Sequence, residues 1–227
     1  MSYKLLENTW LNASDNYTQS IENYVEGIRQ PRHDPNGTKP KVFIIGFNKT
    51  GTSSLHFYFK RNGYKSSHYT EESPIADTII DNIRNNRKIF DNTIGDIYSD
   101  ITWNLGKDGK PRLDAHDIYK IADLQYPGSL FILNIRPVNN WITSRKKHGI
   151  LLRDALNYSQ YSEKEIEDWW KHQYEFYIKD VQLYFKNTNK LLVFDIENDS
   201  IDKVNNFVYP HYKLKSNLWS QDNITKH

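Results

Sequence analysis

Residues 41–55 of the chain read KVFIIGFNKTGTSSL, and this stretch decides the fold. The apolar run 42–45 has the composition of a buried strand, and it ends at Gly46 in a loop rich in hydroxyl groups. A helix-like segment begins near Ser53. A glycine-rich turn into a helix directs several backbone N–H donors, and the positive end of the helix dipole, at one point. The stretch therefore predicts a strand, an anion-binding loop and a helix.

The lysine of this loop precedes its last glycine. A Walker A loop places lysine directly after the second glycine, where this chain has Thr52. Residues 48–55 instead resemble the 5′-phosphosulfate-binding loop of sulfotransferases that use PAPS (3′-phosphoadenosine 5′-phosphosulfate), in which Lys-[Ser/Thr/Gly]-Gly-Thr follows the first strand. The resemblance implies that Lys49 is catalytic, close to the oxygen that bridges sulfate and 5′-phosphate. The cofactor-binding residues it implies here are Asn48, Lys49, Thr50, Gly51, Thr52, Ser53 and Ser54.

A second segment extends the resemblance. Residues 129–135 read SLFILNI, which is typical of a buried strand, and Arg136 follows directly, with Ser144 eight residues later. Sulfotransferases carry a similar succession of strand, arginine, helix and serine. The resemblance implies that Arg136 and Ser144 bind the 3′-phosphate of PAPS. Arginine suits this role because its guanidinium offers paired donors to phosphate oxygens.

Strand and helix patterns alternate along the chain. Such alternation predicts an α/β fold with a parallel β-sheet flanked by helices, and the resemblance implies the P-loop NTPase-like sulfotransferase fold. Ligands are then expected at the carboxyl ends of the strands. The predicted strands are 42–45, 64–67, 129–135 and 191–195, and the predicted helices are 53–61, 114–125, one from Ser73 and one from Ser162, with a possible short helix at 20–28.

The chain divides into a polar, partly helical segment at 1–40 and a single domain at 41–227. The resemblance covers residues 41–145 and the predicted strand 191–195. The loop looks closer to carbohydrate-type and to bacterial or viral sulfotransferases than to the cytosolic small-molecule enzymes. Those enzymes close the cofactor site with a C-terminal Arg-Lys-Gly stretch, which residues 205–227 lack.

An acceptor hydroxyl normally needs a general base. Several sulfotransferase families place a glutamate or histidine just after the second strand, where this chain has His68 and Glu71. These two residues are the predicted bases, and Asp96 follows them as a candidate. Glu71 has the alternative role of favouring the start of the next helix.

Three functions remain open from the sequence. The first is sulfuryl transfer from PAPS to an acceptor hydroxyl or amine, with release of 3′,5′-ADP (PAP). The second is a P-loop nucleotide kinase or NTPase, and the third is a non-catalytic relative that binds 3′,5′-ADP. The second requires a lysine after Gly51 and an aspartate that closes a Walker B strand.

Composition limits the partners. The net charge of +2 gives no indication of a nucleic-acid surface, and no carboxylate cluster predicts a bound metal. The chain has no cysteine, no signal-peptide pattern and no apolar stretch that could span a membrane, so a soluble, cytoplasmic protein is expected. The expected acceptor is a small molecule, a sugar or a lipid-like compound, and the oligomeric state stays open.

Two surfaces have alternative interpretations. The basic run 145–148 is either a solvated helix end or a positive rim for the 3′-phosphate or an anionic acceptor. An apolar stripe on the helix from Ser162 is expected to lie in the core, with a platform for an aromatic ligand as the alternative. Its members are Ile166, Trp169, Trp170, Tyr177, Val181 and Tyr184.

Overall fold

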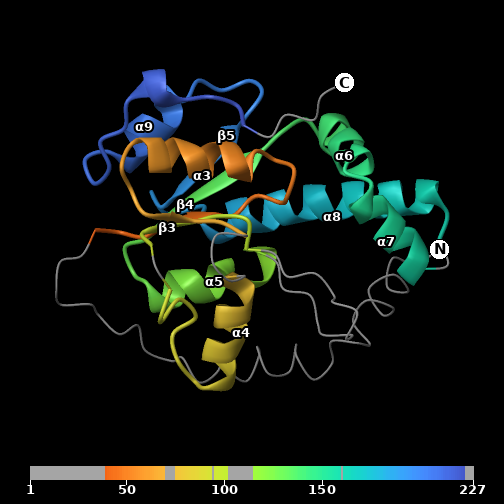
Figure 1. Cartoon of the computed structure of the whole chain (residues 1–227), viewed down its shortest axis with the longest axis horizontal. Helices are drawn as coiled ribbons and strands as arrows, with labels where there is room; N and C mark the ends of the chain where they lie inside the picture. The colour runs from red at the N-terminus through yellow and green to blue at the C-terminus, as the bar shows by residue number, and fades with distance from the viewer. Residues whose placement is uncertain (1–38, 70–74, 94, 102–114, 160, 223–227) are drawn as a thin grey trace.

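The computed structural model describes residues 39–69, 75–93, 95–101, 115–159 and 161–222. Within them, five strands form one parallel sheet in the order β2-β3-β1-β4-β5 (Figure 1). The strands are β1 (Val42–Ile44), β2 (Ser66–Ser67), β3 (Ile97–Tyr98), β4 (Leu130–Ile135) and β5 (Leu191–Asp195).

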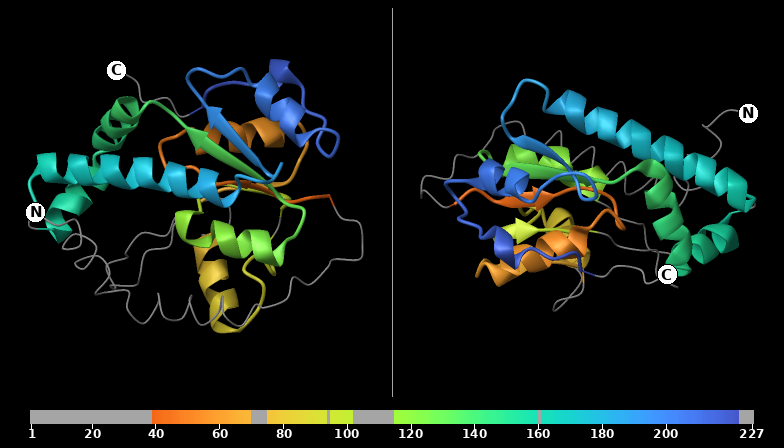
Figure 2. Two further views of the ribbon diagram at one scale, coloured as in Figure 1. Left: turned by 180° about the vertical axis from the view of Figure 1, so that it is seen from behind. Right: turned by 90° about the horizontal axis from the view of Figure 1, so that it is seen from above.

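Helices cover both faces of the sheet, as Figure 2 shows when the molecule is seen from above. The described helices are α3 (Thr52–Arg61), α4 (Ile75–Arg84), α5 (Ala115–Gln125), α6 (Val138–Lys147), α7 (Ile150–Tyr158), α8 (Glu163–Tyr184) and α9 (Asp202–Val208), with a short 3-10 helix η1 (Ser216–Leu218). α3 and α9 lie on one face, and α5 and the long α8 lie on the other.

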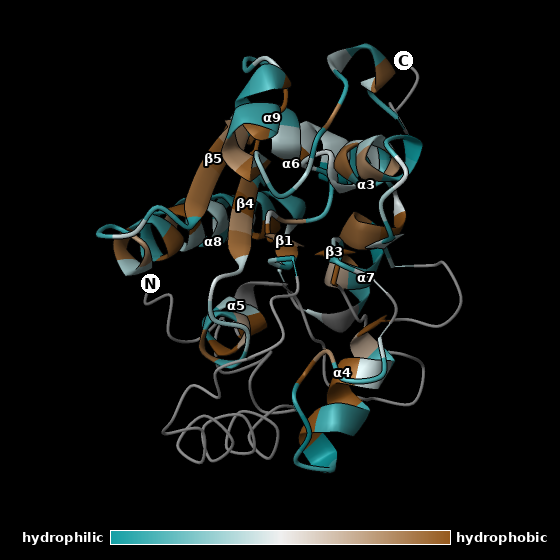
Figure 3. Ribbon diagram, turned by 90° about the vertical axis from the view of Figure 1, so that its left-hand side faces the viewer, coloured by the Kyte–Doolittle hydropathy of each residue, from teal (hydrophilic) through white to brown (hydrophobic). Residues whose placement is uncertain are grey.

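The central strand β1 explains why two helical layers are needed. Val42 and Ile44 pack into a hydrophobic cluster with α3 and α9, whereas Phe43 packs into a second cluster with α4, α5 and α8. All three side chains are buried. Alternate residues of a strand point to opposite faces, so a strand that is apolar throughout must be covered on both. The hydropathy colouring in Figure 3 shows β4 and β5 as mainly hydrophobic.

The predicted fold class is confirmed, since the sheet is parallel and flanked by helices. The first strand, the strand at 129–135 and the strand at 191–195 all appear near their predicted bounds. The helix expected from Ser162 begins with the predicted capping box, in which Ser162 and Glu165 bond each other's backbone N–H groups. The predicted division at residue 40 stays a prediction, and the possible helix at 20–28 lies outside the described residues.

Some elements differ from the prediction. β3, α7 and α9 were not predicted. β3 has two residues, too few to show a hydrophobic periodicity, and it forms by pairing with β1 and β2. The strand expected at 64–67 is reduced to Ser66–Ser67. In the stripe of α8, Tyr184 is exposed and Trp169 only partly buried, while Tyr174 is buried in the core.

Candidate active site

The loop between β1 and α3 has the backbone shape that an anion-binding turn requires. Lys49 and Gly51 have φ angles of 68° and 88°, both left-handed. A β-carbon on Gly51 would lie 1.8 Å from Cδ1 of Ile196, so both the φ angle and the space require glycine. Gly51 is also the cap residue of α3 and offers no side-chain acceptor to the first-turn N–H groups. These groups and the helix dipole therefore favour a bound anion.

Asn134, on β4, holds both ends of this loop. Its Oδ1 accepts a hydrogen bond from the N–H of Gly46 at 2.8 Å, and its Nδ2 donates to the carbonyl oxygen and Oγ1 of Thr50 at 3.0 and 2.8 Å. Asn134 and Thr50 are fully buried. One amide thus satisfies three buried polar groups and fixes the loop against the neighbouring strand.

Other carbonyl groups of the loop are bonded to side chains from the helices. Tyr177 donates to the carbonyl oxygen of Ile45 at 2.7 Å, and Nε1 of Trp141 donates to that of Asn48 at 3.0 Å. These bonds turn the loop's carbonyl groups toward the protein. An anion is therefore favoured on the other side of the loop.

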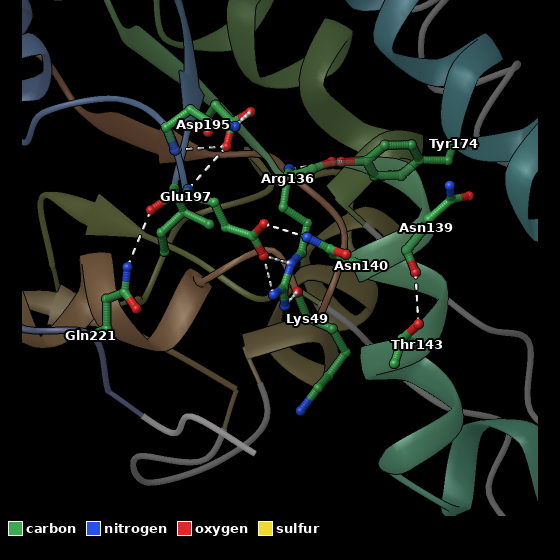
Figure 4. Close-up of polar contacts among 11 residues, drawn as sticks. Lys49, Arg136, Asn139, Asn140, Thr143, Tyr174, Asp195, Glu197 and Gln221 are labelled. Carbon is green, nitrogen blue, oxygen red and sulfur yellow. Dashed lines mark hydrogen bonds and ion pairs between the residues drawn. The ribbon is translucent and has the colours of Figure 1, made fainter. Parts of the chain in front are cut away.

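Arg136 follows β4 and lies against the loop (Figure 4). Its NH1 donates to the carbonyl oxygen of Lys49 at 3.1 Å. Its backbone N–H and carbonyl group both bond the hydroxyl of Tyr174, at 3.0 and 2.9 Å. Burial raises the pKa of Tyr174 to about 12, so this hydroxyl stays protonated and fixes the backbone at the end of the strand. The structure thus brings together Lys49 and Arg136, which are 87 residues apart in sequence.

Ser144, the second residue expected to bind a 3′-phosphate, is buried in α6. Among the described residues, no hydrogen bond joins it to Arg136. Its role stays a prediction.

His68 lies on the other side of the loop, just after β2. Its Nε2 is 3.4 Å from Oγ of Ser53 and 3.5 Å from Oδ2 of Asp100. Burial lowers the pKa of Lys49 below its ordinary value; the carboxylate of Asp100 opposes this shift, and the positive charge of Arg136 adds to it. His68 and Asp100 therefore lie together just beyond the carboxyl ends of β2 and β3, at the edge of the sheet where Lys49 follows β1.

The other two candidate bases have different outcomes. Glu71 lies outside the described residues. Asp96 precedes β3, and its carbonyl oxygen accepts a hydrogen bond from the N–H of Val42 at 2.8 Å, at the amino end of β1. Asp96 therefore lies at the end of the sheet opposite to Lys49. The prediction of Asp96 as a candidate base is wrong.

Residues 41–160, more than half of the 227-residue chain, match the sulfotransferase domain family. The chain belongs to this family. No curated protein matches the sequence significantly. In the described part of this sulfotransferase, no group of three or more potential metal ligands gathers, and no helix is both long and apolar enough to cross a bilayer. The expected cytoplasmic location and the expected absence of a metal stay predictions.

The basic run 145–148 of this sulfotransferase is not simply a solvated helix end. Arg145 is buried, lies over the rings of Trp141 and Trp170 and donates to Oδ1 of Asn48 at 3.0 Å. Arg145 therefore fixes the side chain of Asn48, in the loop, against α6 and α8. By contrast, Lys146 forms ion pairs with two glutamates at the start of α8, at 2.7 and 2.6 Å.

His148 was not predicted as a site residue. Burial lowers its pKa, and the positive charges of Lys49 and Arg145 lower it further. The neutral imidazole of His148, at the end of α6, is therefore favoured.

Asn134, Asp100 and Glu197 were also missed. Asn134 is a polar residue inside an apolar strand, a signal that could have marked it. Asp100 and Glu197 each lie two residues beyond the strands β3 and β5, where parallel sheets place ligand-binding side chains. Applying this rule to the predicted strand 191–195 would have found Glu197.

Proposed function

We propose that the chain transfers a sulfuryl group from PAPS to a hydroxyl or amine of an acceptor and releases 3′,5′-ADP. Membership of the sulfotransferase domain family supports sulfuryl transfer in general. The observation that carries the choice of donor is the hydrogen bond from Arg136 to the carbonyl group of Lys49, 3.1 Å long. It joins the expected anchor of the 3′-phosphate to the loop expected to hold the 5′-phosphate of the same nucleotide.

The residues suit a donor with two anionic groups. N–H groups at the start of α3, with the hydroxyls of Thr52 and Ser53, would hold the 5′-phosphate, while Arg136 and Ser144 would hold the 3′-phosphate. PAPS supplies the activated sulfuryl group. Lys49 would stabilise the charge that develops on the leaving oxygen. The lowered pKa of Lys49 makes this ammonium a readier proton donor to the same oxygen.

His68 is the proposed general base toward the acceptor. The carboxylate of Asp100, 3.5 Å from Nε2 of His68, would favour the protonated imidazole that forms when the acceptor hydroxyl loses its proton. The proposed acceptor is a small molecule, a sugar or a lipid-like compound. The kinase alternative gains no support, because Thr52 stands where a Walker A loop has its lysine.

Nucleotide binding tests the donor. Wild-type protein is expected to bind 3′,5′-ADP at least about tenfold more tightly than 5′-ADP or ATP-Mg²⁺, and Arg136→Ala should remove this preference, because charge-assisted hydrogen bonds to the 3′-phosphate are lost. Isothermal titration calorimetry measures both. Arg153→Ala on α7 removes the same charge from an exposed position and should change nothing. Tighter binding of ATP-Mg²⁺ than of 3′,5′-ADP would refute the choice of PAPS.

His68→Gln tests the base. Release of 3′,5′-ADP from PAPS, followed with a panel of phenols, sugars and amines, is expected to slow by about a hundredfold or more, because proton removal from the acceptor is lost. Affinity for 3′,5′-ADP should stay unchanged. His172→Gln, on the exposed side of α8, is the matched control. Full activity of His68→Gln would refute His68 as the general base.

A further inference from the structure

The carboxylate of Glu197 forms an ion pair with the guanidinium of Arg136 (Figure 4). Oε1 of Glu197 accepts from Nε of Arg136 at 2.7 Å and also from its NH2. Oε2 accepts from Nδ2 of Asn140 at 2.6 Å. NH1 donates to the carbonyl oxygen of Lys49, so all three guanidinium nitrogens of Arg136 donate to groups of the protein.

The backbone that carries Glu197 is anchored independently of this ion pair. Its N–H donates to Oδ1 of Asp195 at 2.9 Å, and the carboxylate of Asp195 also bonds the backbone and side chain of Asn198. The N–H of Asp195 in turn donates to Asp199 at 2.8 Å. The side chain of Glu197 can therefore leave Arg136 by rotation about its own bonds, without opening the turn after β5.

We propose that Glu197 sets the selectivity of the donor site between nucleotides with and without a 3′-phosphate, by competing with that phosphate for Arg136. This inference rests on the proposed function. Carboxylate and phosphate are both anions and both suit the guanidinium fork, so they exclude each other there. A nucleotide with a free 3′-hydroxyl leaves the ion pair intact, whereas a 3′-phosphate must first displace it.

Partial burial and a bond from Asn140 strengthen the ion pair that the 3′-phosphate must displace. The side chains of Arg136 and Glu197 are 24% and 25% exposed, so solvent screens their attraction only in part. Asn140 adds a second bond to the carboxylate and holds it in place. A phosphate carries more negative charge than a carboxylate and can displace it from Arg136. The gain in binding free energy is smaller than at an arginine that has no carboxylate partner.

The test compares 3′,5′-ADP with 5′-AMP, two nucleotides that differ only in the 3′-phosphate. Glu197→Gln is expected to tighten binding of 3′,5′-ADP by about tenfold and to leave that of 5′-AMP unchanged. Asn140→Ala should act in the same direction with a smaller effect. Glu175→Gln removes one negative charge from an exposed position on α8 and leaves the turn after β5 intact, so it serves as the control for long-range electrostatics.

A double-mutant cycle shows whether the effect passes through Arg136. In an Arg136→Ala background, Glu197→Gln should no longer change the affinity for 3′,5′-ADP. If wild-type protein binds 3′,5′-ADP through Arg136 and Glu197→Gln leaves that affinity equal or weaker, the selectivity role is refuted while the donor stands. If neither wild type nor Glu197→Gln binds 3′,5′-ADP, the proposed donor fails and this inference fails with it.

Discussion

Lys49→Ala is expected to lower the turnover of sulfuryl transfer by at least about a hundredfold, because the leaving oxygen of the donor loses the positive charge that stabilises it. The carbonyl group of residue 49, which accepts from Arg136, is retained in this variant. Affinity for 3′,5′-ADP should therefore fall much less than turnover. The measurement is the rate of 3′,5′-ADP release at saturating PAPS, with the acceptor that the wild type uses fastest.

Lys186→Ala, at an exposed lysine beyond the end of α8, is the control for a general loss of positive charge. Lys49→Arg keeps the charge but changes its reach, and an intermediate rate is expected. Thermal unfolding should be nearly the same in all three variants. Wild-type turnover in Lys49→Ala would remove the chemical role assigned to the loop.

Asn134→Leu is expected to lower the free energy of unfolding by about 3 kcal/mol, because three buried polar groups lose their hydrogen bond to Asn134, although the hydroxyl of Thr50 still donates to the carbonyl oxygen of Phe47. These groups are the N–H of Gly46 and the carbonyl and hydroxyl groups of Thr50. Urea unfolding followed by circular dichroism measures the change. The loop should also bind 3′,5′-ADP more weakly, since both of its ends lose their attachment to β4.

Asn85→Leu is the matched control for the Asn134 variant. Asn85 is exposed, and within the described ranges its side chain bonds only Asp81, in the last turn of α4. A change within about 0.5 kcal/mol is expected there. If Asn134→Leu also changes stability by less than about 1 kcal/mol, the amide does not hold the loop as the structure indicates.

The sequence predicted those parts of the fold that local patterns determine. An apolar run of four residues before Gly46 marks β1, and the run before Arg136 marks β4, because both are long enough to show burial on two faces. β3 gives no such signal, since its two residues become a strand only through their neighbours in the sheet. The α/β architecture was predicted, but the strand order β2-β3-β1-β4-β5 was not.

The site residues also divide into those that local patterns mark and those that only tertiary contacts bring together. The loop lysine and Arg136 were predicted as site residues because each lies in a short motif beside a strand. Asp100, beyond β3, affects the pKa of Lys49, and Glu197, beyond β5, pairs with Arg136; both reach these residues only when the chain has folded. The basic run that contains Arg145 suggested either a solvated helix end or a positive rim for an anion, whereas the guanidinium of Arg145 lies over two tryptophan rings.

The side-chain bonds to the carbonyl groups of the loop have a consequence for the kinetics of binding. Asn134, Trp141, Tyr177 and Arg136 hold these groups through hydrogen bonds within the protein. The loop is therefore preorganised, and little conformational entropy remains to be lost on association. We expect the association rate to be governed by diffusion and by the rotation of Glu197, so that the loop itself contributes no slow folding phase.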